Sequence, residues 1–204
     1  MKSSDKAQDK SGWLDTIKTL FIAGLIAISF RSVIAEPFNI PSGSMIPTLL
    51  VGDYLFVSKF SYGYSRHSFP FSAAPISNRV MASTPERGDV AVFRPPSNVS
   101  VDYIKRVVGL PGDRIQVKRG ILHINGQAVE RRLVGNGNIA SGQSSLVTQR
   151  YEEVFPDGHR HIIQEVSDNQ IFGSTPEFTV PDGHYFMMGD NRDNARDSRS
   201  SSVG

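Results

Sequence analysis

The chain has 204 residues, of which 39% are hydrophobic and 21% are charged, and its formal net charge is +2. This composition is typical of a globular protein and excludes a collagen-like or disordered chain, while the small net charge without a basic stripe argues against a nucleic-acid partner. Because the chain contains no cysteine, a cysteine nucleophile, a thiolate zinc site and disulfide bonds are excluded.

The first element in the chain is apolar. Residues 17–35 read IKTLFIAGLIAISFRSVIA, and as a helix they would extend roughly 28 Å, about the thickness of one hydrocarbon core. We predict a transmembrane anchor at 17–35 and a cytoplasmic tail at 1–16, because lysines gather before the segment. A cleaved secretory signal is the alternative, since a basic start, a short apolar region and small residues share this pattern.

The rest of the chain, residues 36–204, is predicted to be an all-β domain of antiparallel sheets on the outer side of the membrane. Short runs rich in β-branched and aromatic residues alternate with turn signals that contain Gly, Pro, Asn and Asp. The predicted strands are 54–57, 90–93, 103–108, 114–117, 121–124 and 184–188.

A softer stretch, residues 118–178, is rich in Gly, Asn and Ser and is expected to be loop-rich, as a secondary lobe or β-rich insertion. Within it, residues 152–163 are expected to form a hairpin around a Pro-Asp-Gly turn. His159 and His161 are expected at its exposed tip. No third ligand accompanies them, so neither a metal nor a cofactor is predicted.

The turn Pro41-Ser42-Gly43-Ser44-Met45 follows the apolar segment closely. A serine in such a turn is usually only a turn residue. However, Gly43 allows backbone conformations that let Ser44 project, and the Ser44 N–H with the Ser42 hydroxyl could stabilise an oxyanion. Ser44 is therefore a candidate nucleophile.

Lys105 lies in the predicted strand 103–108. Alternation places it on one face with Tyr103 and Val107, while Arg106 points to the other face, toward an ion pair or solvent. A lysine can act as a general base only if its pKa falls well below the ordinary value of about 10.4, which burial in an apolar pocket can achieve. Lys105 is a candidate base for Ser44.

Four motifs occur in order: Pro41 to Leu49, Gly52-Asp53, Asp102 to Asp113, and Gly189 to Arg199. Together they resemble the conserved boxes of bacterial type I signal peptidase (leader peptidase). The resemblance implies that Ser44 is the nucleophile, Lys105 the general base, and Ser42 a hydroxyl donor in the oxyanion hole.

The resemblance also implies two further groups of residues. Shallow apolar pockets for the small residues at the −1 and −3 positions of a preprotein would be lined by Ile40, Pro41, Met45, Leu49, Tyr103 and Ile104. Arg106 and Asp190 would form a structural ion pair, and Asp197 and Arg199 would support the site.

The implied protein is a single-pass serine endopeptidase of the bacterial inner membrane, with its catalytic domain on the periplasmic side. It would remove signal peptides from exported preproteins at A-x-A-like sites, with preproteins and the lipid bilayer as partners. The alternative is a membrane-tethered β-domain that binds exported chains or envelope proteins without catalysis. A Ser-Lys self-cleaving repressor would need a DNA-binding module in place of the membrane span.

Two departures from the family pattern are visible. Ala195 stands where the family usually has a serine that orients the lysine, so we expect that hydrogen bond to be missing or made by another group. Family members also continue beyond the last box, so this chain, which ends at Gly204, is expected to be a shortened copy. Separately, the aromatic stretch 60–71, with Phe69 and Phe71, is expected either in a core or among lipid headgroups.

Overall fold

The computed structural model describes residues 5–64, 79–141 and 144–200. The chain divides into two compact units, one formed by Met1–Phe38 and Tyr54–Thr84 and the other by Asn39–Asp53 and Pro85–Gly204. Phe69 and Phe71 lie outside the described residues, so their placement stays a prediction.

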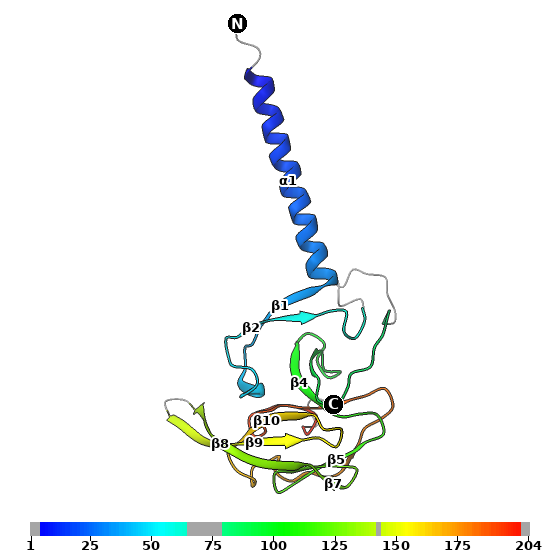
Figure 1. Ribbon diagram of the computed structural model, residues 1–204, viewed down its shortest axis with the longest axis vertical. Coiled ribbons are helices and arrows are strands. Elements are labelled where there is room, and N and C mark those ends of the chain that lie inside the picture. The colour runs from blue at the N-terminus through cyan, green and yellow to red at the C-terminus, as the bar shows by residue number, and fades with distance from the viewer. Residues whose placement is uncertain (1–4, 65–78, 142–143, 201–204) are drawn as a thin grey trace. The chain divides into compact units, whose positions relative to one another are not determined.

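The first unit contains the apolar helix. Helix α1 (Asp5–Val33) includes a span, Gly12–Arg31, with a mean hydropathy of 1.5 and exposed side chains, so it is long and apolar enough to cross a membrane. The predicted apolar helix is thus confirmed. Strands β1 (Ala35–Asn39) and β2 (Tyr54–Ser58) form a two-stranded sheet after it (Figure 1). Glu36 in β1 pairs with Arg31 at 2.8 Å and with Lys59 at 2.9 Å, which ties the helix end to the strands.

The second unit consists of antiparallel strands and one short 3-10 helix. Three sheets have the strand orders β12-β4-β3, β11-β5-β6-β7 and β10-β9-β8. This confirms the predicted mainly β fold. The elements are η1 (Gly43–Met45), β3 (Val90–Phe93), β4 (Tyr103–Gly109), β5 (Arg114–Lys118), β6 (Ile121–Ile124), β7 (Gln127–Ala128), β8 (Glu130–Ser141), β9 (Ser144–Val154), β10 (Arg160–Glu165), β11 (Phe178–Thr179) and β12 (Phe186–Met188).

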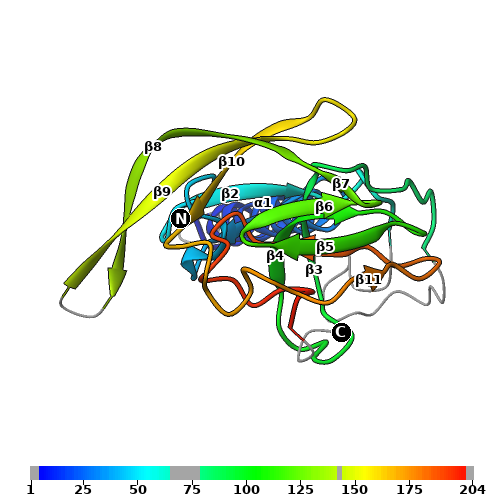
Figure 2. The same ribbon diagram turned by 90° about the horizontal axis from the view of Figure 1, so that it is seen from below.

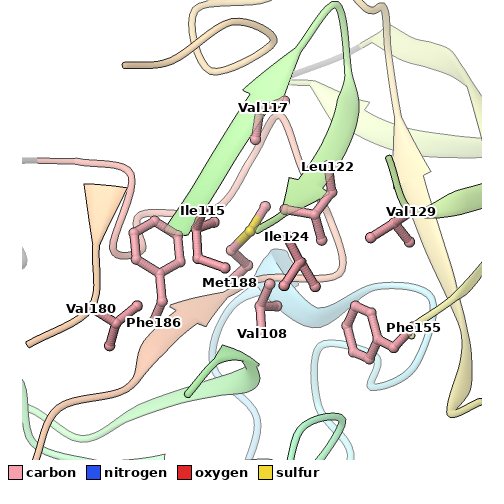
Figure 3. Packing of buried hydrophobic residues seen from close by; sticks show 10 residues of the cluster. All are labelled: Val108, Ile115, Val117, Leu122, Ile124, Val129, Phe155, Val180, Phe186 and Met188. Atoms are coloured by element: carbon pink, nitrogen blue, oxygen red, sulfur yellow. The ribbon is translucent and has the colours of Figure 1, made fainter. Parts of the chain in front are cut away.

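The hydrophobic core of this unit forms around the β5–β6 hairpin (Figure 3). Ile115 pairs with Ile124, and Val117 with Leu122, so alternate side chains of both strands face the same interior. Side chains from β4, β12 and neighbouring loops complete the cluster. Its ten members are Val108, Ile115, Val117, Leu122, Ile124, Val129, Phe155, Val180, Phe186 and Met188.

Strand β4 is central to its sheet and is buried from Ile104 to Gly109. β3 and β12 flank it on either side, and Lys105 and Arg106 are only 4% and 5% exposed, so both side chains have little access to water. A buried charge requires a partner, so the solvent alternative for Arg106 is wrong and the ion-pair alternative holds.

The stretch after residue 118 is β-rich, as one part of the expectation had it, whereas the expected loops are wrong for residues 130–141 and 144–154. Strands β8 and β9 pair from Glu130 with Val154 to Ser141 with Ser144, and Figure 2 shows them as a long twisted ribbon. Tertiary contacts override the weak β propensity of this segment. At Gly137, an added Cβ would lie 2.5 Å from Gln164 Oε1, so glycine allows the close approach.

The predicted hairpin at 152–163 is confirmed, with Val154 opposite Arg160. Its histidines differ from the expectation of an exposed tip. His159 is exposed, whereas His161 is 7% exposed and its ring centroid lies 4.6 Å from that of Phe155. The expectation is therefore wrong for His161, because alternation in β10 turns this side chain inward.

Candidate active site

The turn that carries Ser44 is held by the segment that follows β12. Asn191 Nδ2 donates to the Gly43 carbonyl at 2.8 Å, and the Asn191 N–H donates to the Ser44 carbonyl at 3.1 Å. At Gly189, a Cβ would lie 2.5 Å from the Ser44 carbonyl oxygen, so glycine is needed for this approach. Ser44 itself is 7% exposed. The hydrogen bonds to the carbonyl groups of Gly43 and Ser44 fix its position.

Lys105 meets Ser44 inside the second unit. Lys105 Nζ lies 2.7 Å from Ser44 Oγ, in a buried hydrogen bond between residues 61 positions apart in the chain. The Tyr103 ring centroid lies 5.3 Å from Nζ. The two candidate catalytic groups that the sequence singled out are therefore in direct contact.

The electrostatic surroundings of Lys105 favour a neutral amine. Burial lowers the pKa of Lys105 below its ordinary value, because an ammonium loses its hydration there, whereas the carboxylates of Asp197 and Asp190 act in the opposite direction. The effect of burial is the larger one, and the net shift is downward. A base of this kind is suited to remove the proton of a hydroxyl group.

Both of these carboxylates are paired with arginines. Arg106 binds Asp190 through two contacts, Nε to Oδ1 at 2.9 Å and Nη2 to Oδ2 at 2.8 Å. Arg199 binds Asp197 in the same two-point manner at 2.9 and 2.8 Å, and Asp197 also accepts the Gly189 N–H at 3.0 Å. Bidentate pairs of this type fix geometry as well as charge.

The second hydrogen bond of Lys105 is made by the backbone. Nζ donates to the Ile104 carbonyl oxygen at 2.8 Å. Ala195, which is 4% exposed, offers no hydroxyl. We expected the hydrogen bond of the missing serine to be absent or made by another group, and the structure has a main-chain carbonyl as the second acceptor for Lys105. The residue type at position 104 does not predict such an acceptor.

The proposed substrate-contacting residues differ in exposure. Pro41 is exposed, Leu49 and Tyr103 are half-buried, and Ile104 is buried; Ile40 and Met45 have no exposed surface. Ser42 is exposed, and among the described residues its hydroxyl makes no hydrogen bond.

A second buried charge cluster lies outside the Ser44–Lys105 contact. Arg192 binds Glu153 at 2.8 and 2.5 Å. Burial alone would raise the pKa of Glu153, but Arg192 and His161 together hold it at about 2. Sequence reasoning assigned no role to these residues or to Asn191. Their only sequence signal is that Asn191 and Arg192 fall within the last motif. In the parts of the chain that the structure describes, no group of three metal-ligating side chains is found.

Comparison with known proteins shows which family the chain resembles. The family "Signal peptidase, peptidase S26" matches residues 13–204. A signal peptidase I of Rickettsia canadensis (strain McKiel) is 44% identical over 183 residues, covering 85% of this chain and 68% of the relative. A signal peptidase I of Rickettsia akari (strain Hartford) is 41% identical, covering 97% of this chain and 75% of the relative.

Among solved structures, a signal peptidase I from Enterococcus faecalis V583 is 25% identical and covers 57% of this chain and 86% of its own, with a TM-score of 0.32. The family match extends over nearly the whole chain, and the relatives are well above 30% identical over most of their length. The chain therefore belongs to the signal peptidase family, peptidase S26, and is a serine peptidase that cleaves signal peptides.

Proposed function

We propose that Ser44 and Lys105 form the catalytic dyad of this peptidase. The observation that carries the proposal is the buried 2.7 Å contact between Lys105 Nζ and Ser44 Oγ. A lysine whose pKa is lowered by burial can accept the serine proton, which an exposed ammonium cannot do.

In the proposed reaction, Lys105 Nζ takes the proton from Ser44 Oγ as Oγ bonds to the carbonyl carbon of the scissile peptide bond. The resulting ammonium gives this proton to the leaving amine as the C–N bond breaks, which leaves an ester between Ser44 and the signal peptide. Water then loses a proton to Lys105 and attacks the ester, and Ser44 regains its proton. The hydrogen bond from Nζ to the Ile104 carbonyl orients the amine throughout.

The oxyanion of each tetrahedral intermediate would bind two donors of the same turn. These are the Ser44 N–H and the Ser42 hydroxyl, and neither has an acceptor among the described residues. Free donors beside the nucleophile are what a developing negative charge needs, because they require no rearrangement during the reaction.

The substrates are proposed to be exported preproteins with small residues at −1 and −3, as in A-x-A. The apolar side chains assigned to these subsites are Ile40, Pro41, Met45, Leu49, Tyr103 and Ile104. In a peptide series, replacing Ala by Leu at −1 should abolish cleavage, because the larger side chain does not fit into a shallow pocket. Equal cleavage of both peptides would contradict this assignment.

The apolar span Gly12–Arg31 is proposed to anchor the enzyme in the bacterial inner membrane, with the catalytic unit on the periplasmic side. Lysines precede the span, and positive residues favour the cytoplasmic side. Protease added outside spheroplasts should digest the chain beyond Glu36. Protection of that part until the cells are lysed would contradict the orientation.

The central test compares preprotein cleavage by the wild type with that by Ser44→Ala and Lys105→Ala. Both variants should lose cleavage, while Ser100→Ala and Lys118→Ala, at exposed positions of the same unit, should retain it. A tethered binding domain would instead bind preprotein without cleaving it in any form. Cleavage retained by either dyad variant would refute the proposed mechanism.

A further inference from the structure

The second unit contains an open hollow of about 720 Å³. Arg106 contributes to its wall, and alternation in β4 places this residue on the opposite face from Lys105. The polar part of the lining consists of three arginines, two histidines and two neutral residues, namely Arg106, Arg150, Arg160, His159, His161, Thr48 and Asn136. Among the described residues that line it there is no Asp or Glu.

The arginines of this hollow are not equally neutralised. Arg106 is paired with Asp190, as described above. Arg160 lies 3.3 Å from Glu152 in an exposed contact, where an ion pair contributes little. Arg150 donates from Nε to Gln164 Oε1 at 3.1 Å, and in the described parts of the chain no carboxylate pairs with it. Its guanidinium therefore keeps donors and charge available for an anion.

His161 adds an unsatisfied acceptor to the same lining. Its side chain is 2% exposed, and Nε2 lies 3.3 Å from Glu153 Oε2. Within the described structure neither Nδ1 nor Nε2 makes a hydrogen bond of good geometry. Burial lowers the pKa of His161 and so favours the neutral ring. Because Nε2 is the nitrogen that faces a carboxylate, the neutral ring keeps its proton there and its lone pair on Nδ1. A buried polar atom without a partner indicates an occupant that supplies one.

We propose that this hollow binds a phosphate group. The oxygens of a phosphate would accept hydrogen bonds from Arg150 and Arg160, which present planar sets of donors suited to such oxygens. A proton on the phosphate, or a hydroxyl beside it, would donate to His161 Nδ1. Free phosphate, a soluble phosphate ester and a phospholipid headgroup all share this chemistry.

The test uses the full chain in phosphate-free, non-ionic detergent near neutral pH, with inorganic phosphate titrated calorimetrically. The wild type should bind phosphate, and Arg150→Gln should bind it at least tenfold more weakly, while Arg150→Lys should retain part of the affinity. Arg132→Gln is the matched control, because Arg132 is an exposed arginine of the same sheet that pairs with Glu152 and does not line the hollow. Circular dichroism establishes that each variant is folded.

Two further ligands sharpen the test. Sulfate carries no proton near neutral pH, so it should bind more weakly than phosphate if His161 Nδ1 accepts a hydrogen bond. Short-chain phosphatidylglycerol added to the micelles should displace phosphate if a headgroup is the natural source, and should leave its binding unchanged if the source is soluble. Absence of phosphate binding, equal binding by Arg150→Gln and Arg132→Gln, or sulfate binding as tight as phosphate would overturn the proposal.

Discussion

Replacing Asn191 by alanine should slow catalysis without touching any proposed catalytic group. The side chain of Asn191 donates to the Gly43 carbonyl at 2.8 Å, directly before the nucleophile in the chain. The backbone contact from Asn191 to the Ser44 carbonyl remains in the variant. The turn should therefore stay in place but lose one of the two hydrogen bonds that fix it.

The magnitude follows from the two polar atoms that the substitution affects. Leaving the Gly43 carbonyl without its partner costs about 1–3 kcal/mol. The Asn191 Oδ1 atom is buried and has no hydrogen-bond partner among the described residues, so its removal offsets part of this cost. We expect a net loss of about 1–2 kcal/mol, which corresponds to a kcat about 5–30-fold lower if it is expressed in the placement of Ser44.

Steady-state cleavage of a signal-peptide substrate measures this effect. The kcat should fall while KM changes little, because Asn191 positions the nucleophile and does not contact the substrate subsites. Asn194→Ala, at an exposed position in the same segment, should match the wild type. A variant with unchanged kcat, or one whose loss lies entirely in KM, would refute the positioning role of Asn191.

Three other predictions concern Lys105. The value of kcat/KM should rise with pH through the lowered pKa of Lys105, because only the deprotonated amine is a base, and a profile that rises only near the ordinary lysine value would contradict its burial. Ala195→Ser should raise kcat about twofold to tenfold, because the new hydroxyl gives Nζ a hydrogen bond in addition to the one it makes with the Ile104 carbonyl. An assay that shows no gain would count against weaker positioning of Lys105 by Ala195. Arg199→Gln removes the positive charge that neutralises Asp197, so the pKa of Lys105 should rise and the pH profile should move upward; a loss of rate without such a move would indicate a purely structural role for Arg199.

The strands of the core could be predicted because local signals and tertiary structure agree there. Alternating apolar residues between turn residues marked β5 and β6, and the same pattern packs them in the structure. Around Gly137 the signals disagree: glycine and asparagine indicate a loop, but cross-strand pairing and the close approach of Gln164 require a strand. Such a requirement arises from a partner distant in the chain, so local sequence does not carry it.

The candidate site shows the same division. Ser44 and Lys105 could be singled out because their local sequence is informative. Gly43 precedes the serine in a turn that follows the apolar segment, and strand alternation places the lysine on one face with Tyr103 and Val107. The acceptor that holds Lys105 is the main-chain carbonyl of Ile104, and every residue has such a carbonyl. The role of Asn191 likewise depends on the backbone carbonyl to which its side chain donates. The sequence motif contains Asn191 but does not predict this partner.

The burial that makes Lys105 a base also opposes folding. The unfolded chain binds a proton at this lysine up to pH values near 10.5, whereas the folded state releases it earlier because its pKa is lowered. Between the lowered pKa of the folded state and 10.5 the unfolded state therefore binds more protons. The unfavourable contribution of Lys105 to stability is at its full size below this window and is relieved as pH rises through it. Unpaired carboxylates at Asp190 and Asp197 would relieve this penalty, but they would do so by restoring the ammonium and removing the base. Pairing them with Arg106 and Arg199 limits that effect, so the unfavourable burial of Lys105 is left to be offset by favourable interactions elsewhere in this unit, such as the apolar packing around β5 and β6.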